Sequence, residues 1–128
     1  EMPCCLVGSE MCIRDSMVGA LQKALLIRPE FPQLMKKIKP RDARGNLDRT
    51  SAALILAKTG TLHYVSALAG YVTEGVARPY AFAIFCQDLE QRQKLLASAR
   101  ETSPNARYWN RRAKQVQQNV LRKWSQKL

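Results

Sequence analysis

Three apolar runs decide the fold of this chain: Ala52-Ala53-Leu54-Ile55-Leu56-Ala57-Lys58, Leu62 to Val72, and Tyr80-Ala81-Phe82-Ala83-Ile84-Phe85. The first two are continuous, as expected for strands that are covered on both faces. The third alternates large with small side chains, so its small-residue face can approach a covering helix closely. Gly75, in the connector from Thr73 to Arg78, predicts that the second and third runs form an antiparallel hairpin.

Beyond Asp88 the apolar period changes from two to 3.6 residues. Ser103-Pro104 supplies an N-cap with proline at the first helical position. Apolar residues then recur at spacings of three and four, at Trp109, Ala113, Val116, Val120, Trp124 and Leu128. The sequence therefore predicts an α+β fold: a partial antiparallel sheet of about three strands (Ala52–Thr59, Leu62–Val72 and Arg78–Cys86) with a packed C-terminal helix.

The residues before the sheet predict helices and a loop. A helix that contains Leu21, Leu25 and Leu26 should stop at Arg28-Pro29, because the residue before proline is pushed out of the α region. A short helix is expected to follow through Leu34, Met35 and Ile38, before Pro40. The polar segment from Lys39 to Thr50 has the composition of a surface loop.

The first sixteen residues differ from the rest of the chain. Val7 to Ser16 resembles the conceptual translation of a transposon-end adapter used in sequencing libraries. We therefore assign residues 1–16 to a non-native segment and residues 17–128 to the domain, and expect the first segment to adopt no structure and make few contacts. The alternative is a genuine disordered N-terminus.

Cysteine content excludes a disulfide framework. Cys4, Cys5 and Cys12 lie in the adapter-like segment, which leaves Cys86 at the end of an apolar run. A lone cysteine supports neither a disulfide nor a metal site, so we expect a buried thiol that acts as a small hydrophobe rather than a nucleophile. Metal-ligand spacing, paired carboxylates and a phosphate-binding glycine loop are absent from the sequence, and no cofactor is expected.

The formal net charge is +11, which invites a polyanionic partner. Basic residues occupy one face of the C-terminal helix, at Arg107, Arg111, Arg112, Lys114, Arg122 and Lys123. One hypothesis is thus a basic module that binds nucleic acid or anionic lipid. Trp109, Val116 and Trp124 fall on the apolar stripe and should pack on the sheet rather than stack on bases, so nucleic acid is not the expected partner. No apolar stretch reaches the roughly eighteen residues that span a bilayer.

Lys58-Thr59-Gly60 directly follows the first apolar run and is the candidate functional motif. A structural alternative is a strand end followed by a turn, in which Gly60 supplies a positive φ. His63, the single histidine, lies just beyond the motif. Its side chain could transfer a proton, but a histidine near solvent in a strand or turn is the simpler interpretation.

The surroundings of this motif carry a family resemblance. Ala57 to Leu62, Val65 to Val72 and Ala81 to Ile84 closely resemble the C-terminal portion of the D-alanyl-D-alanine carboxypeptidases of the low-molecular-mass class C penicillin-binding proteins. The likeness covers most of Leu47 to Leu128 and implies a β-lactamase/transpeptidase-like fold.

The resemblance assigns roles to four residues. Lys58, Thr59 and Gly60 correspond to the substrate-binding third motif, and the backbone N–H of Thr61 corresponds to one oxyanion-hole donor. A Lys58 ammonium would neutralise the substrate carboxylate, and the Thr59 hydroxyl would donate to it. Without a Cβ at Gly60, a substrate backbone could lie along the strand edge and pair with it.

The catalytic nucleophile is missing. The Ser-x-x-Lys of the family, which brings the nucleophile and its base, does not occur in this chain. Ser103-Pro104-Asn105 matches Ser-x-Asn by spelling, but it follows the Lys-Thr-Gly motif and opens a helix, so we interpret it as a cap. We therefore expect a C-terminal fragment that is inactive alone. A further possibility is that it lacks an independent stable fold, because residues 17–128 would leave an apolar sheet face uncovered.

The resulting prediction is a serine-type D-alanyl-D-alanine carboxypeptidase, with possible endopeptidase activity, that acts on peptidoglycan D-alanyl-D-alanine peptides through an acyl-enzyme. β-Lactams would acylate the full-length parent. A β-lactamase or esterase of the same fold is the sibling alternative, which only upstream residues would separate. The resemblance implies a periplasmic or exported enzyme.

Overall fold

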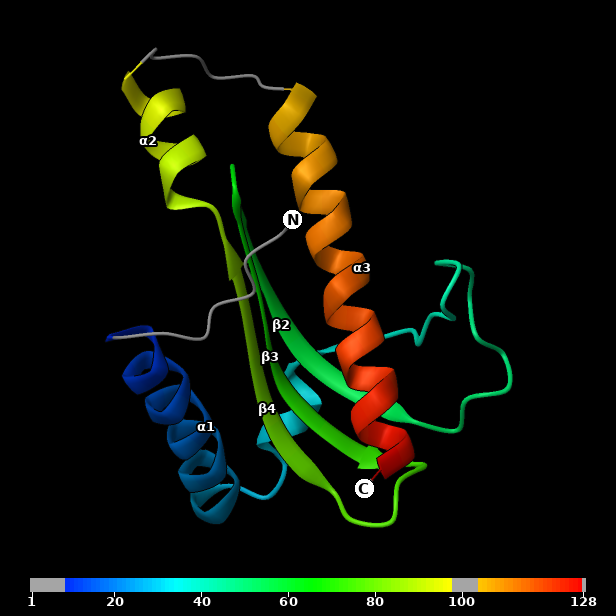
Figure 1. The fold of residues 1–128 in the computed structure, drawn as a ribbon. Helices are drawn as coiled ribbons and strands as arrows, with labels where there is room; N and C mark the ends of the chain where they lie inside the picture. Colours follow the sequence, from blue (N-terminus) through cyan, green and yellow to red (C-terminus); the bar gives the residue numbers. More distant parts are fainter. Residues whose placement is uncertain (1–8, 98–103, 128) are drawn as a thin grey trace.

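The protein is represented by a computed structural model that describes residues 9–97 and 104–127. Its elements, in chain order, are α1 (Ser9–Ile27), the 3-10 helix η1 (Phe31–Leu34), β1 (Lys36–Ile38), β2 (Leu54–Leu62), β3 (Val65–Glu74), β4 (Tyr80–Gln87), α2 (Leu89–Ala97) and α3 (Pro104–Lys127). In Figure 1 the sheet stands between α1 on one side and α3 on the other.

The described strands form one antiparallel sheet in the order β1-β2-β3-β4. The predicted α+β class is confirmed, as is the antiparallel order of the three long strands. The expected strand count of about three is wrong, because a short fourth strand, β1, adds to the outer edge of β2. Connections of a few residues between the long strands make antiparallel neighbours the natural outcome.

The strand boundaries near the candidate motif also differ from the prediction. β2 does not stop at Thr59 but runs through Gly60 to Leu62, and the turn to β3 consists of His63 and Tyr64. Leu62, which we expected to begin the second strand, is therefore the last residue of the first. The Lys-Thr-Gly motif lies inside a strand rather than at its end.

The hydrophobic core lies between the sheet and α3. Its buried members are Ile55, Ala57, Leu68, Val72, Phe82, Ile84, Cys86, Ala113 and Leu121. Cys86 is fully buried, as expected of a small hydrophobe. A free energy of roughly 25 cal/mol for each Å² of apolar surface removed from water makes this layer the main source of stability.

The face that α3 presents to the sheet is rotated relative to our prediction. Its most deeply buried residues are Ala106, Ala113, Gln117 and Leu121. Trp109 and Val120 pack beside the core as predicted, but Trp124 is 38% exposed. The small side chains of Ala106 and Ala113 let the helix approach the sheet closely, so the large residues sit at the flanks of the contact.

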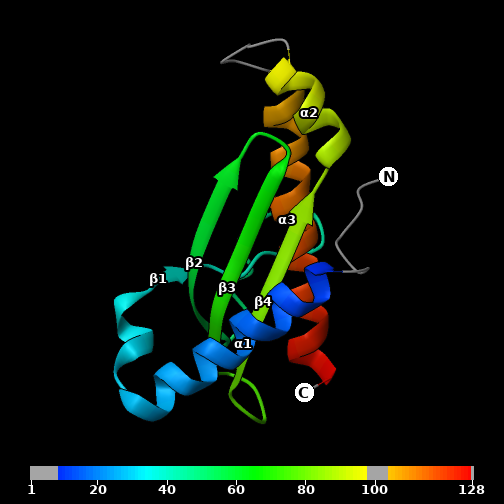
Figure 2. The ribbon, with the colours of Figure 1, turned by 90° about the vertical axis from the view of Figure 1, so that its left-hand side faces the viewer.

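The opposite sheet face is partly covered by α1, which crosses β3 and β4 (Figure 2). The Tyr71 hydroxyl of β3 donates a buried 2.6 Å hydrogen bond to the backbone carbonyl of Leu21. α1 ends at Ile27, where Arg28-Pro29 was predicted to stop it. Its start at Ser9 corrects our expectation that residues 1–16 adopt no structure, although the proposed adapter origin of that segment stays a prediction. Ser103, the predicted cap of α3, lies outside the described residues.

The short helix predicted through Leu34, Met35 and Ile38 is not formed. Instead η1 ends at Leu34, and β1 pairs with β2 through Lys36–Ala57, Lys37–Leu56 and Ile38–Ile55. Pairing with a long neighbouring strand overrides the local helical spacing here. In the described part of the chain, no helix combines the length and apolar character needed to cross a membrane.

Candidate functional site

The candidate motif occupies an exposed stretch of β2. Residues 55 and 57 are buried, whereas every residue from Lys58 to Leu62 is exposed. The residue with positive φ in this region is Tyr64 (φ 59), in the turn, and not Gly60. The alternative in which Gly60 serves a turn is therefore wrong, and the motif forms part of an extended strand.

β2 has an open edge along the motif. On one side it pairs with β3 from Leu54 to Leu62, and on the other side β1 reaches only as far as Ala57. Beyond Ala57, no described strand pairs with that side of β2, and Figure 2 shows its upper half without a neighbour. An unpaired strand edge presents backbone donors and acceptors that another extended chain can use.

The register determines which backbone groups face this edge. The N–H of Asp88 donates to the carbonyl of Tyr64 at 2.9 Å, so the even-numbered residues of β3 direct their backbone groups toward β4. Its odd-numbered residues then face β2 and bond their partners there, which include Gly60, opposite Ala67. The N–H and C=O groups of Thr59 and Thr61 consequently point to the open edge.

The Lys58 ammonium also lies at this edge. Alternation along β2 places its side chain on the sheet face opposite α3, but Nζ turns back and donates to the carbonyl oxygen of Thr59 at 2.8 Å. Among the described residues, the ion pairs are Arg28–Glu30 and Lys94–Glu90, and neither involves Lys58. The positive charge of Lys58 is thus not compensated by a carboxylate of the described chain.

Gly60 is not required by the packing of this chain. A Cβ added to Gly60 would meet only the Cβ of Ala67, at 3.7 Å, which is an ordinary contact. Gly70, in the neighbouring strand, differs because a Cβ there would collide with the backbone of Leu56 and Ala57. A need for glycine at position 60 would have to come from a molecule that lies against the open edge.

Two polar residues of α3 hold the strands around the motif. Asn110 Nδ2 donates to the carbonyl oxygen of Leu62 at 3.0 Å. Gln117 Nε2 donates to the backbone carbonyl of Ser66 at 3.0 Å and to its hydroxyl at 3.2 Å. Neither residue was predicted from the sequence. Gln117 could have been found, because a buried polar residue within an apolar helical stripe is a signal of such a contact.

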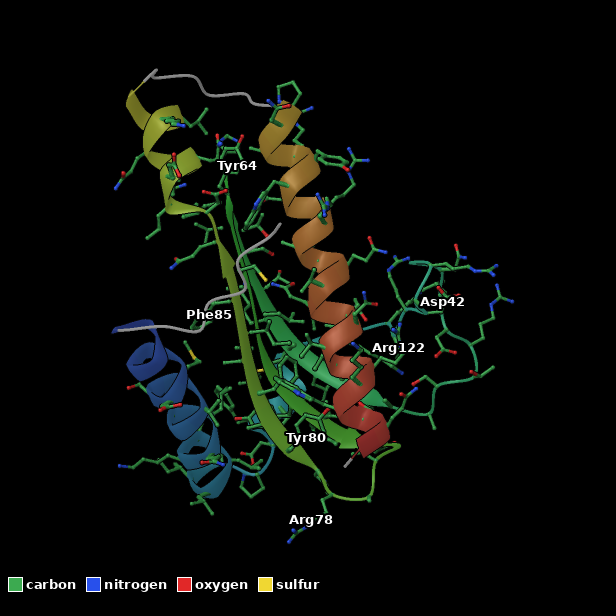
Figure 3. All side chains as sticks on the ribbon, viewed as in Figure 1. Asp42, Tyr64, Arg78, Tyr80, Phe85 and Arg122 are labelled. Atoms are coloured by element: carbon green, nitrogen blue, oxygen red, sulfur yellow. The ribbon has the colours of Figure 1, made fainter. Side chains whose placement is uncertain are left out.

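The turn after the motif is fixed by the two C-terminal helices. Tyr64 is buried and makes an edge-to-face contact with Trp109, with ring centroids 5.9 Å apart; Figure 3 shows Tyr64 between the end of the strands and α3. The Arg92 guanidinium of α2 donates to the backbone carbonyl of His63 at 3.0 Å. His63 is a half-buried turn residue, in agreement with the simpler of our two interpretations.

A cavity of about 220 Å³ lies elsewhere. It is lined by the loop before β2 and the C-terminal half of α3, including Asp48, Ser51, Arg122 and Ser125, and by none of residues 58–62. Hydrogen bonds from Thr50 lower the pKa of the Asp48 carboxyl. Within residues 9–97 and 104–127, no cluster of three His, Cys, Asp or Glu side chains could hold a metal ion.

Comparison with known families supplies the remaining observation. Residues 40–102 match the family model of D-Ala-D-Ala carboxypeptidase 3 (S13). We call residues 40–102, which are similar to that family, the S13 segment. The S13 segment spans β2, β3 and β4, and therefore contains Lys58, Thr59, Gly60 and Thr61. No curated protein and no solved structure matches the chain.

The S13 match confirms the resemblance predicted from the sequence. It supports a function of the D-Ala-D-Ala carboxypeptidase type and implies peptidoglycan peptides as substrates. It also suggests an exported enzyme that acts on the cell wall.

Proposed function

We propose that residues 17–128 are the C-terminal part of a serine-type D-alanyl-D-alanine carboxypeptidase, and that residues upstream of them supply the nucleophile and its base. One observation carries the proposal. Within an S13 segment, Thr59 and Thr61 direct backbone groups to an open strand edge where the Lys58 ammonium also lies. This arrangement suits a peptide that ends in a carboxylate and pairs as an added strand.

Each group at the edge then has a role in substrate binding. The Lys58 ammonium compensates the terminal carboxylate of the substrate, and the exposed Thr59 hydroxyl donates to it. The hydrogen bond from Lys58 Nζ to the Thr59 carbonyl keeps the charge beside the edge rather than in bulk solvent. Gly60 leaves room for the backbone of the substrate, because the packing of this chain does not require a glycine there.

The Thr61 N–H is the proposed oxyanion-hole donor of this chain. When a serine hydroxyl attacks the scissile carbonyl, negative charge develops on the carbonyl oxygen, and a fixed N–H stabilises that charge more in the transition state than in the ground state. The hydrogen bond from Asn110 to the Leu62 carbonyl anchors the end of β2, one residue after Thr61. The acyl-enzyme is then hydrolysed, which releases the shortened peptide.

The same edge accounts for the wider predictions. β-Lactams present a carboxylate next to a strained amide, so they would occupy the site and acylate the serine of the parent enzyme. Cross-linked peptides would enter in the same orientation, which permits endopeptidase activity. A β-lactamase or esterase of this fold would differ in a base that activates water for deacylation, and that base lies outside these residues. The site of action is the periplasm or another exported location.

Nuclear magnetic resonance titration of the 128-residue chain tests the binding step. The ligand is an N-acetylated peptide ending in D-Ala-D-Ala, and the control ligand is its C-terminal carboxamide. The carboxylate peptide should shift the amide resonances of Thr59 and Thr61, and Lys58→Ala should weaken this response. Lys23→Ala, which removes an exposed charge on α1, is the matched control and should leave it unchanged. Equal responses to the two ligands, or shifts confined to residues around Arg122, would contradict the proposal.

A further inference from the structure

The N-terminal half of α3 carries a group of three exposed cations. Arg107, Arg111 and Lys114 are all exposed and are spaced four and three residues apart, so they lie together on the helix surface. We call these three residues the α3 cation cluster. Like charges at this spacing repel one another, which makes a bound anion favourable.

The cluster has no compensating acid nearby in sequence. α3 contains no aspartate and no glutamate over its 24 residues. Neither of the two ion pairs found among the described residues involves an α3 side chain. Arg112, next to the cluster, instead lies over the ring of Tyr108, 5.8 Å from its centroid. No acidic side chain of the described residues compensates the positive charge of this surface, which therefore attracts an anionic partner.

The position of Asn110 locates the cluster relative to the candidate site. Asn110 contacts the carbonyl of Leu62 at the end of β2, and it lies three residues after Arg107 and four before Lys114. Residues at these spacings share one flank of a helix. Farther along this flank, Leu121 lines the cavity together with Ala53 and Ile55, at the other end of β2. Ser125, on the same flank, contacts the Tyr80 hydroxyl at the start of β4, so the flank runs from the end of β2 near the motif to the start of β4. Arg107 and Lys114 belong to its N-terminal part and therefore lie near that end of β2.

We propose that the α3 cation cluster is an exosite that binds the anionic peptidoglycan polymer near the end of β2 that carries the motif. Peptidoglycan strands carry many stem-peptide carboxylates besides the one that is recognised at the scissile end. A strand held by Arg107, Arg111 and Lys114 presents neighbouring stem peptides to Lys58 and Thr61. This inference rests on the proposed function, and it predicts preference for polymer over a soluble dipeptide through increased local concentration.

Charge explains why a polymer suits this surface better than an embedded lipid. The apolar face of α3 is engaged with the sheet through Ala113 and Leu121, so the helix cannot insert it into a bilayer. What remains exposed is a row of guanidinium and ammonium groups, and these bind carboxylates at the surface of a polymer. Such contacts between exposed charges weaken as salt increases.

Co-sedimentation of the 128-residue chain with purified insoluble peptidoglycan tests the proposal. The bound fraction should fall several-fold between low and physiological salt. The bound fraction should fall by a similar factor when the peptidoglycan carboxylates are converted to amides. This second comparison changes the ligand and leaves the protein unmodified. Binding that survives amidation would overturn the proposal.

Variants locate the binding surface. The triple variant R107Q/R111Q/K114Q should lose most of the binding. The control K23Q/R44Q/R78Q removes the same charge from α1, from the loop before β2 and from the β3–β4 turn, and should bind as the unmodified chain does. Circular dichroism verifies that both variants keep their helix content. If the triple variant unfolds, the single variant Arg111→Gln replaces it and should lose part of the peptidoglycan binding. Equal losses of peptidoglycan binding in both triple variants would show that net charge, and not a specific site, determines binding, and would contradict the proposal.

Two further outcomes separate this inference from other accounts. If the cluster variant loses duplex DNA binding but keeps peptidoglycan binding, the surface is a nucleic-acid site and the proposal is wrong. If the chain binds peptidoglycan through the cluster while the D-Ala-D-Ala peptide leaves Thr59 and Thr61 unshifted, the exosite stands and the proposed edge site fails. If the D-Ala-D-Ala peptide shifts Thr59 and Thr61 but the cluster variant still binds peptidoglycan, the edge site stands and the exosite proposal is wrong.

Discussion

Gln117 of α3 holds Ser66 of β3 through two hydrogen bonds, one to the backbone carbonyl and one to the hydroxyl, and Ser66 lies directly opposite Thr61 in the sheet. Both Gln117 and Ser66 are buried, so this contact is shielded from water. It links the covering helix to the strand pair that presents the proposed oxyanion donor.

Replacing Gln117 by Ala should therefore destabilise the fold. The substitution leaves the Ser66 hydroxyl buried without its partner, which costs about 1–3 kcal/mol. Chemical denaturation with a fluorescence or circular dichroism readout measures the loss. Gln115→Ala, an exposed position on the same helix, is the matched control and should change the free energy of unfolding by less than about 0.5 kcal/mol. Similar effects of the two substitutions would contradict the role given to Gln117.

Two glycines of the sheet should respond differently to alanine. Gly70→Ala places a methyl group against the backbone of Leu56 and Ala57 and should cost at least about 1–3 kcal/mol. Gly60→Ala meets only Ala67 at 3.7 Å, so stability should be nearly unchanged. The same Gly60 substitution should weaken binding of the D-Ala-D-Ala peptide, because the proposed site gives the space beside Gly60 to the backbone of the ligand. If the Gly60→Ala variant binds the peptide as strongly as the unmodified chain, Gly60 does not provide space for the ligand and its proposed role is wrong.

Stability should decline at high pH through Tyr71. Burial raises the pKa of its hydroxyl above the ordinary value of 10.0, and the hydroxyl donates to the Leu21 carbonyl. A raised pKa in the folded state means that the stabilising contribution is complete below pH 10 and is lost as the pH rises above it. Tyr71→Phe should cost about 0.5–1.5 kcal/mol at pH 7 and flatten this decline. An unfolding series from pH 8 to pH 11.5 would refute the account if both proteins lost stability in parallel.

The 128-residue chain should form no covalent adduct with a fluorescent penicillin. No serine in the sequence is followed three residues later by lysine, the spacing that puts nucleophile and base on one helical face. Ser66, which faces the core, is bonded to Gln117 rather than to a base. Intact mass spectrometry after incubation is the measurement. A stable stoichiometric adduct would reveal a nucleophile in this chain and overturn the fragment proposal.

Periodicity alone predicted the elements with strong apolar patterns. The three long strands and α3 follow from runs such as Tyr80 to Phe85, because their residues are buried in the folded protein and therefore carry the pattern. The end of α1 at Ile27 followed from the proline at position 29. These local signals do not depend on tertiary context.

The sequence-based predictions were wrong where a strand is exposed to solvent and where pairing between distant segments determines the structure. β2 continues past Thr59 as an exposed edge strand, so Gly60 and Thr61 carry no apolar pattern that would have extended the prediction. β1 exists because Ile38 pairs with Ile55, a contact that local sequence does not show. The rotation of α3 arises from the close approach at Ala113, whereas we had centred the stripe on its large residues.

The candidate site was predicted only in part. The motif itself suggested Lys58 to Thr61, but the open edge became visible only with the short length of β1. Asn110 was missed because a polar residue next to an apolar stripe is ordinary in an amphipathic helix. Its contact with the Leu62 carbonyl depends on the crossing of the helix over the hairpin.

The measurement that tests the central claim most directly is the acylation rate of the parent enzyme, obtained by extending the reading frame upstream of Met17. We expect Lys58→Ala to slow acylation by penicillin roughly 10- to 100-fold, because a hydrogen bond to a charged group contributes about 1.5–3 kcal/mol and about 1.4 kcal/mol corresponds to a factor of ten. Lys23→Ala, on α1, should acylate at the unmodified rate. Unchanged acylation of the Lys58 variant would show that this lysine does not face the substrate and would contradict the account.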